Sequence, residues 1–284
     1  MRTVYLNGYF VEEDKANISI FDRGFLFADA IYEVTAVIDA KFIDFKGHMA
    51  RLHRSLNELG LQSPCSDDEI LDIHRALVER NNLTEGLVYM QITRGAADRD
   101  FIFPPKDTPP TIVMFTQEKK LVSPPVLQRG MKIATIEDLR WARRDIKTVQ
   151  LLYPSMAKMA AREKGADDAW FIEDGFITEG TSNNAFIITQ DGTLVTRHLS
   201  NSILHGITRD SVLKTTNDLN ITVEERAFTV EEVKSAAEAF LTSASQPIVP
   251  VVEIDGCVIG TGEPGLKTMQ LREAYLKVAK ETSI

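Results

Sequence analysis

The 284-residue sequence has few cysteines, no long apolar run and no excess of positive charge. Its two cysteines, Cys65 and Cys257, lie far apart and have no close histidine or cysteine partner, so we expect neither a disulfide framework nor a metal site. No stretch approaches the roughly 18 apolar residues that a membrane helix needs. The first residues also lack the apolar core of a signal peptide. We therefore expect a cytoplasmic protein without a membrane partner.

The charge balance and the missing Walker lysine motif count against further classes of partner. The formal net charge is −9, whereas a surface that binds nucleic acid is normally basic, so we expect no nucleic acid partner. No Walker lysine motif occurs, which removes one support for a nucleotide-binding fold. A small anionic ligand stays compatible with the sequence, because local arginines rather than the net charge set the potential at a site.

The pattern of apolar residues predicts an N-terminal region of mixed helix and strand. The apolar residues on either side of Asn7-Gly8 are typical of a β-hairpin. Apolar side chains spaced three and four apart predict helices near residues 47–59 and 67–81. Strands fit residues 87–94 and 111–116, and the prolines between them interrupt what would otherwise be continuous sheet.

The C-terminal half mixes helices and strands without regular alternation. A run of strands is expected over residues 169–197, and helices are expected at 154–164, 207–219, 230–238 and 266–280. Such an order favours α+β layers over a doubly wound sheet. The length favours two domains, and the proline-rich, charged stretch before residue 130 is typical of a linker. We predict a small α/β domain at 1–118, a linker at 119–130, and a large domain at 131–284 that carries the lysine described next.

Lys147 is a candidate nucleophile. It is flanked by Ile146, Val149, Leu151 and Leu152, whose burial would make the amine a neutral nucleophile able to form a Schiff base. A solvated lysine is the ordinary alternative.

Two later segments contain groups suited to an anionic ligand. Glu179 precedes a run of small polar residues, which predicts either a surface turn or a nest of donors around an anion. Gly206-Ile207-Thr208 leads into a predicted helix, whose first free amides favour phosphate. Simple capping of that helix by Thr208 would give the same pattern.

Taken in order, these segments resemble the fold-type IV pyridoxal-phosphate enzymes, most of all the D-amino acid transaminases. The resemblance covers essentially the whole chain and is carried by residues 22–34, 48–52, 145–147, 178–183 and 206–210. The same group includes branched-chain L-amino acid transaminases, (R)-amine transaminases and aminodeoxychorismate lyases. The resemblance implies a two-domain α+β fold of type IV and a homodimer with active sites at the subunit interface.

The resemblance also implies pyridoxal 5′-phosphate as the cofactor and a role for each matching residue. Lys147 would form the Schiff base and move the proton between the substrate and the cofactor. Glu179 would face the pyridine nitrogen and favour its protonated form, which makes the cofactor an electron sink. Arg51 would bind the phosphate with help from two residues at the start of a helix. The other cofactor-binding residues so implied are Ser182, Leu204, Ile207, Thr208, Ser243 and Ala244.

The substrate is argued from residues outside the cofactor site. Arg99 and Tyr32 match an arginine and a tyrosine that hold the substrate α-carboxylate in D-amino acid transaminases, whereas Phe101 stands in the place of a histidine. We expect transfer of an amino group from a D-amino acid to a 2-oxo acid such as 2-oxoglutarate or pyruvate. Because one donor is lost at Phe101, we also expect weaker carboxylate binding and some activity on (R)-primary amines.

Three other functions stay open at this point. A branched-chain L-amino acid transaminase and an aminodeoxychorismate lyase would use the same lysine. A homeostasis protein that only binds pyridoxal phosphate would need neither a proton shuttle nor a carboxylate at the ring nitrogen. The presence of both Lys147 and Glu179 therefore favours an enzyme.

Overall fold

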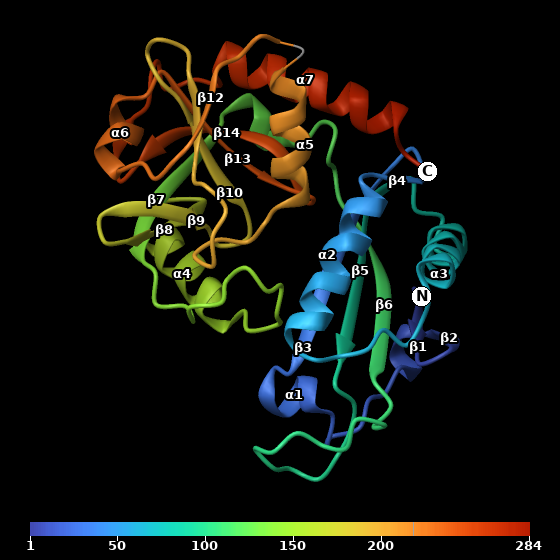
Figure 1. Cartoon of the computed structure of the whole chain (residues 1–284). Coiled ribbons are helices and arrows are strands. Elements are labelled where there is room, and N and C mark those ends of the chain that lie inside the picture. The colour runs from blue at the N-terminus through green and yellow to red at the C-terminus, as the bar shows by residue number, and fades with distance from the viewer. Residues whose placement is uncertain (218) are drawn as a thin grey trace. The chain divides into compact units, whose positions relative to one another are not determined.

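The computed structural model describes residues 1–217 and 219–284, which form two compact units. Unit 1 contains Met1–Lys120 and two short segments, Ile146–Gln150 and Ser283–Ile284, and unit 2 contains Leu121–Asp145 and Leu151–Thr282 (Figure 1). Among the described residues, no helix has both the length and the apolar character that crossing a membrane requires. The chain therefore passes from one unit to the other at several points, and each unit is assembled from separate stretches of sequence.

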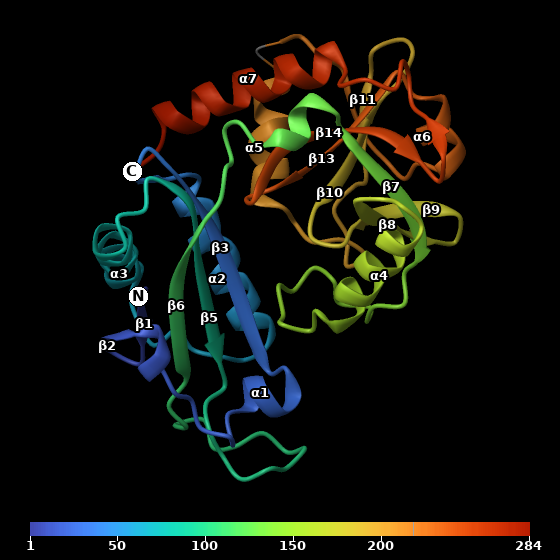
Figure 2. The ribbon, with the colours of Figure 1, turned by 180° about the vertical axis from the view of Figure 1, so that it is seen from behind.

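A six-stranded sheet with the order β2-β1-β6-β5-β3-β4 is the framework of unit 1. Its strands are β1 (Thr3–Leu6), β2 (Tyr9–Glu12), β3 (Ala30–Ile38), β4 (Lys41–Phe42), β5 (Glu85–Thr93) and β6 (Thr111–Glu118). The helices are η1 (Glu13–Lys15), α1 (Arg23–Phe27), α2 (Phe45–Glu58) and α3 (Asp67–Arg80). Helices α2 and α3 share one apolar core with the sheet, and both views show α2 running alongside β3 (Figures 1 and 2).

Local sequence explains where these elements begin and turn. The hairpin between β1 and β2 turns at Asn7 and Gly8, both with positive φ, as a tight turn of this type requires. Helix α3 begins at a capping box, in which the Ser66 side chain accepts from the amide of Glu69 and the Glu69 carboxylate accepts from the amide of Ser66. The predicted hairpin, helices and strands of this region are confirmed to within two residues at each end.

The segment that contains Lys147 extends the edge of the unit 1 sheet. The amide of Tyr32 donates to the carbonyl of Lys147 at 3.0 Å, and the amide of Val149 donates to the carbonyl of Ala30 at 3.2 Å. The lysine was expected within the large C-terminal domain, but its contacts assign it to unit 1. The physical reason is this backbone pairing with β3, which lies more than a hundred residues earlier in the chain.

A nine-stranded sheet organises unit 2, with the order β12-β11-β10-β13-β14-β7-β8-β9 and β15 paired to β14. The strands are β7 (Met131–Glu137), β8 (Asp168–Glu173), β9 (Phe176–Gly180), β10 (Asn184–Ile188), β11 (Leu194–Thr196), β12 (Val223–Glu225), β13 (Glu238–Ser243), β14 (Gln246–Ile254) and β15 (Cys257–Val258). The helices are η2 (Pro125–Gln128), α4 (Leu152–Glu163), α5 (Ile207–Thr216), α6 (Val230–Ser235) and α7 (Leu266–Glu281). This mixture confirms the predicted α+β class.

Two predicted helices of unit 2 differ from the structure. The helix predicted at 230–238 ends at Ser235, because Ala236 has extended backbone and residue 238 already begins β13. The helix predicted at 207–219 ends at Thr216, and Asp218, which that prediction also covers, lies outside the described residues. Helix α4 begins two residues before the predicted start and keeps Pro154 in its first turn, where no hydrogen bond from its nitrogen is needed.

Candidate active site

Lys147 is held against an aromatic ring of unit 1. Its Nζ lies 4.1 Å from the centroid of the Tyr32 ring, and its amide donates to the Ser55 hydroxyl at 3.4 Å. An ammonium over a ring face is electrostatically favourable. The expected apolar surroundings are only partly present, because Ile146 is buried whereas Leu152 is 76% exposed and begins α4 in the other unit. The backbone pairing of this segment, more than its apolar neighbours, fixes the lysine beside Tyr32.

Arg51, on α2, is paired with a glutamate on β3. Its Nε and Nη2 donate to the two carboxylate oxygens of Glu33 at 2.8 and 2.7 Å, and His48 Nδ1 lies 2.8 Å from the same carboxylate. All three side chains are buried. Burial alone would raise the pKa of Glu33, but Arg51 and His48 outweigh it and lower the pKa to about 2. The predicted phosphate-binding arginine is thus held in a fixed orientation by an ionised carboxylate.

Glu179, at the end of β9, is 3% exposed and accepts three hydrogen bonds. Oε1 accepts from Arg140 Nη1 at 2.7 Å, while Oε2 accepts from Asn184 Nδ2 at 3.1 Å and from the amide of Leu204 at 3.0 Å. Burial raises the pKa of Glu179 above its usual value, and Arg140 offsets this only in part. The predicted ring-nitrogen carboxylate is therefore fixed in position and incompletely neutralised.

Arg140 was not identified from the sequence, although it is the main partner of Glu179. Its Nε and Nη2 donate to the carboxylate of Asp138 at 2.9 and 2.7 Å, and its guanidinium carbon lies 4.4 Å from the centroid of the Phe171 ring. Asp138 also accepts from the Thr178 hydroxyl at 2.8 Å. One guanidinium thus bridges two buried carboxylates. The sequence signal was weak, because Asp138 and Arg140 look like an ordinary charged pair after a strand.

The start of α5 offers free backbone donors beside this network. Gly206 is the N-cap and has no side-chain cap, so the capping role considered for Thr208 is not found. Within the described part of the chain, the amides of Ile207 and Thr208 meet no acceptor. A Cβ on Gly206 would lie 2.0 Å from Asn184 Oδ1, which means that only glycine lets α5 start this close to Asn184. Asn184 also donates to the carbonyl of Leu204 at 3.0 Å and thereby ties the start of α5 to Glu179.

The remaining predicted cofactor residues lie at turns of unit 2. Ser182 is exposed between β9 and β10. Ser243 ends β13 and Ala244 lies in the turn to β14, where the hydroxyls of Ser243 and Ser245 lie 3.3 Å apart. The structure therefore links Glu179 to Leu204 by a hydrogen bond and leaves the cofactor roles of these turn residues as predictions.

Arg99, the predicted carboxylate ligand, is exposed on the loop between β5 and β6. Its guanidinium carbon lies 5.4 Å from the centroid of the Phe27 ring and 5.5 Å from that of Phe101. Among the described residues no carboxylate pairs with Arg99, and this includes its sequence neighbours Asp98 and Asp100. Arg99 therefore has no ion-pair partner in the described part of the chain and lies close to two aromatic rings.

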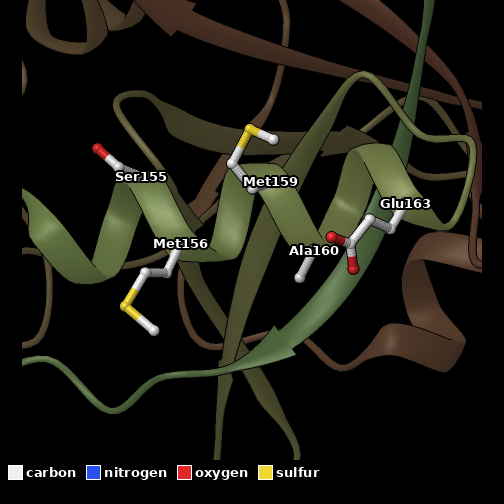
Figure 3. A pocket seen from close by; sticks show the side chains of 5 residues that line it. All are labelled: Ser155, Met156, Met159, Ala160 and Glu163. Atoms are coloured by element: carbon white, nitrogen blue, oxygen red, sulfur yellow. The ribbon is translucent and has the colours of Figure 1, made fainter.

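A shallow apolar pocket on α4 shares no residue with the groups described above. It is lined by Ser155, Met156, Met159, Ala160 and Glu163, which all come from the one helix (Figure 3). None of the predicted site residues lines it.

Each unit, taken by itself, contains donors that suit pyridoxal 5′-phosphate. Lys147 supplies an amine held at one place, and Glu179 supplies a buried carboxylate whose raised pKa leaves it in need of a cationic partner. The uncapped amides of α5 supply donors for a phosphate group.

Comparisons with known proteins agree with this donor set. Residues 30–254 match the model of the family described as amino-transferase class IV. The chain belongs to this family. It is 38% identical over 286 residues to the D-alanine aminotransferase of Staphylococcus aureus strain N315, with all of both chains covered. It is 36% identical over 275 residues to the D-alanine aminotransferase of Bacillus licheniformis, with 95% of each chain covered.

Solved structures of aminotransferases share the fold of this class IV aminotransferase. A branched-chain amino acid aminotransferase from an organism abbreviated T.th., solved with pyridoxamine 5′-phosphate, superposes with a TM-score of 0.89 at 26% identity, covering 99% of this chain and 94% of the other. That of Escherichia coli also superposes with a TM-score of 0.89, at 23% identity over 98% of this chain and 94% of the other, and shows the fold alone. These findings confirm the predicted two-domain type IV fold and the prediction of a pyridoxal-phosphate-dependent aminotransferase.

Proposed function

We propose that this class IV aminotransferase transfers the amino group of a D-amino acid to a 2-oxo acid such as pyruvate or 2-oxoglutarate. The observation that carries the proposal is the full-length similarity to D-alanine aminotransferases, at 36–38% identity. It is supported by Arg99, whose guanidinium is not paired with a carboxylate of the described chain and suits a substrate carboxylate.

Lys147 and Glu179 have complementary tasks in this proposal. Pyridoxal phosphate, when bound, supplies a conjugated ring that accepts the electron pair left after the substrate loses its α-proton. Lys147 holds the cofactor through its Nζ and, once released, takes and returns the proton at that nitrogen. Glu179 binds the ring nitrogen and favours its protonated form, because its own carboxylate lacks full compensation.

Backbone and arginine donors bind the phosphate in this proposal. Ile207 and Thr208 donate their amides at the start of α5, where the helix dipole favours an anion. Arg51 adds positive charge, and Glu33 and His48 fix its orientation. Ser182, Ser243 and Ala244 complete the set of cofactor-binding residues, and Leu204 packs on the ring.

The substrate carboxylate is assigned to Arg99 and Tyr32. The aromatic surroundings of Arg99 orient its guanidinium without neutralising it. Phe101 contributes a ring face there and no hydrogen-bond donor, so we infer that carboxylate binding is weak enough to allow some turnover of (R)-primary amines. We also propose a homodimer with active sites at the subunit interface, which the exposed Phe101, Ile102 and Phe103 support as a surface for a second copy.

The function is tested by mixing the holoenzyme separately with D-alanine, L-leucine and (R)-1-phenylethylamine. We expect D-alanine to bleach the visible band of the bound cofactor fastest, followed by the amine, because a productive donor converts the cofactor to its amine form. Rapid bleaching by L-leucine and none by D-alanine would replace this proposal with a branched-chain L-amino acid aminotransferase, the activity named for the similar solved structures.

The role of Lys147 is tested separately with Lys147→Ala. We expect this variant to lose the visible band and to lose turnover by a factor of about a thousand or more, since both depend on the Nζ atom. Lys46→Ala, which removes an exposed lysine of α2, is the matched control and is expected to behave as wild type. Near-normal turnover by Lys147→Ala would contradict the mechanism.

A further inference from the structure

Residues 94–110, between β5 and β6, carry Arg99 and are called the Arg99 loop below. Hydrogen bonds of Asp22, Arg23 and Gly24 connect α1 to the start of this loop. The Asp22 carboxylate accepts from the amide of Gly24 at 2.8 Å and from the Thr93 hydroxyl at 2.9 Å. The amide of Arg23 donates to the carbonyl of Gly95 at 2.9 Å. A Cβ on Gly24 would lie 2.5 Å from Thr93 Cγ2, so the close approach of α1 to the end of β5 depends on glycine.

The Arg23 side chain reaches from this connection into the Arg99 loop. It is 3% exposed, and its Nη1 donates to the carbonyl of Asp100 at 2.7 Å. Its guanidinium carbon lies 4.4 Å from the centroid of the Phe27 ring, the same ring that Arg99 approaches at 5.4 Å. Arg23 therefore contacts both the backbone next to Arg99 and the ring beneath Arg99.

A carboxylate and a second arginine hold Arg23 in place. Asp29 Oδ2 accepts from Arg23 Nε at 2.8 Å and from Arg94 Nε at 2.7 Å. Both guanidinium groups lie over the Phe103 ring, with carbon-to-centroid distances of 3.9 Å for Arg94 and 5.5 Å for Arg23. The loop is thus fixed on either side of Phe101, at the Asp100 carbonyl and at the Phe103 ring.

We propose that Arg23 is a positioning residue that sets the affinity for the substrate carboxylate by holding the Arg99 loop in one conformation. The proposal rests on the proposed function, in which Arg99 binds that carboxylate. Residues 98–100 are exposed and would otherwise sample many conformations. Every conformation that misplaces Arg99 lowers the fraction of enzyme that is ready to bind the substrate carboxylate. Arg23 acts through Arg99, since its own guanidinium is buried and engaged with Asp29 and Asp100.

The proposal is tested with Arg23→Met, which keeps an apolar stem and removes the guanidinium. In the holoenzyme we expect KM for D-alanine to rise about tenfold while kcat changes by less than about threefold, as for the loss of substrate binding through a loosened loop. Arg2→Met is the matched control. Arg2 likewise donates to a carboxylate (Glu13) and a carbonyl (Thr116) and lies over a ring (Phe115), but on the β1–β2 side of the sheet. Its KM is expected to match wild type.

A double-mutant cycle separates positioning from general stability. Arg23→Met should raise KM very little in an Arg99→Met background, because the residue through which it acts is already gone. An equal factor in both backgrounds would overturn the proposal. Phe27→Leu, which keeps Arg23 but removes the shared ring, should also raise KM and serves if Arg23→Met folds poorly. The proposal would likewise be overturned if KM were normal in Phe27→Leu and the Arg23→Met result also failed. Arg23→Met fails if it leaves KM unchanged, or if it raises KM by the same factor with and without Arg99.

The same experiment distinguishes this proposal from the proposed function. Absence of D-alanine transamination by the wild type would refute the function itself. An unchanged KM in Arg99→Met would refute the assignment of Arg99, and with it the route through which Arg23 is proposed to act. Normal transamination with a raised KM in Arg99→Met, but wild-type behaviour in Arg23→Met, would refute only the positioning role.

Discussion

Each unit contains a glutamate that is almost fully buried beside an arginine, and the pKa values of the two glutamates shift in opposite directions. Glu33 in unit 1 is 1% exposed and has its pKa lowered to about 2. Glu179 in unit 2 is 3% exposed and has its pKa raised. Since burial works in the same direction on both carboxylates, the difference arises from their partners.

The partners differ in how the guanidinium is shared. Arg51 gives two N–H donors to Glu33, and His48 adds a further hydrogen bond. Arg140 gives one N–H to Glu179 and two to Asp138, so its charge serves two carboxylates. A buried carboxylate with a bidentate arginine is a stable structural anion, whereas one that shares its arginine keeps an unmet attraction for positive charge. The comparison marks Glu179 as the one suited to a cationic ring nitrogen.

Among the variants that distinguish the two glutamates, Glu179→Gln is expected to have the largest effect, and this effect is on kcat. An amide cannot stabilise the protonated ring nitrogen, so we expect kcat to fall by about a hundredfold to a thousandfold. The melting temperature of the enzyme without cofactor should not fall, because the costly buried charge is removed as well. The control is Glu163→Gln on the exposed face of α4, which should have a normal kcat (Figure 3). A kcat within threefold of wild type in Glu179→Gln would remove the functional distinction.

Glu33→Gln is expected to act on stability. The lowered pKa, about 2 against an ordinary 4.5, corresponds to about 3 kcal/mol of unfolding free energy at pH 7. We expect a loss of that order in urea unfolding, because Arg51 would also be left buried without its carboxylate partner. An unchanged unfolding midpoint would show that the Glu33–Arg51 pair is not the structural anion described above.

The pH dependence of stability should have opposite signs for the two residues. The contribution of Glu33 is present above pH 4.5 and is lost as pH falls towards about 2, so wild type and Glu33→Gln should converge in acid. The contribution of Glu179 is present below pH 4.5 and is lost as pH rises through its raised pKa, so Glu179→Gln should gain on wild type with rising pH. Both expectations are checked by measuring the unfolding free energy of wild type and of each variant from pH 3 to pH 8. If the difference between wild type and variant changed with pH in the same direction for both residues, the comparison would be contradicted.

A smaller effect is expected from Asp138→Asn, which removes the competitor of Glu179 for Arg140. The charge of Asp138 raises the pKa of Glu179, so the loss of that charge should lower this pKa. Carboxyl ¹³C NMR of the enzyme without cofactor measures this, with the resonance assigned by its absence in Glu179→Gln. Asp167→Asn, which breaks an exposed bidentate pair with Arg129, is the control and should leave the resonance in place.

Site residues that belong to a recognisable local sequence motif could be predicted from the sequence. Site residues whose importance comes from contacts with distant parts of the chain could not. Lys147 and Glu179 were found because neighbours in sequence accompany them. Arg140 was missed because its decisive contact is with Glu179, 39 residues away. The two-domain organisation followed from the chain length, and the α+β class and most of the predicted helices followed from apolar periodicity. The pairing of Thr148 with Ile31 did not, because no local pattern specifies which distant strand edge a short segment joins.

That pairing limits how the enzyme can be divided. A polypeptide that ends at Lys120 would contain the whole six-stranded sheet but no reactive amine, since Lys147 is encoded within the stretch that otherwise builds unit 2. The backbone groups of Ala30 and Tyr32 would then lose their partners and leave an open strand edge, which is prone to aggregate. Splitting the gene at the boundary therefore yields an N-terminal fragment that is chemically inert, and only reassembly with the second fragment would return the missing amine to its place beside Tyr32.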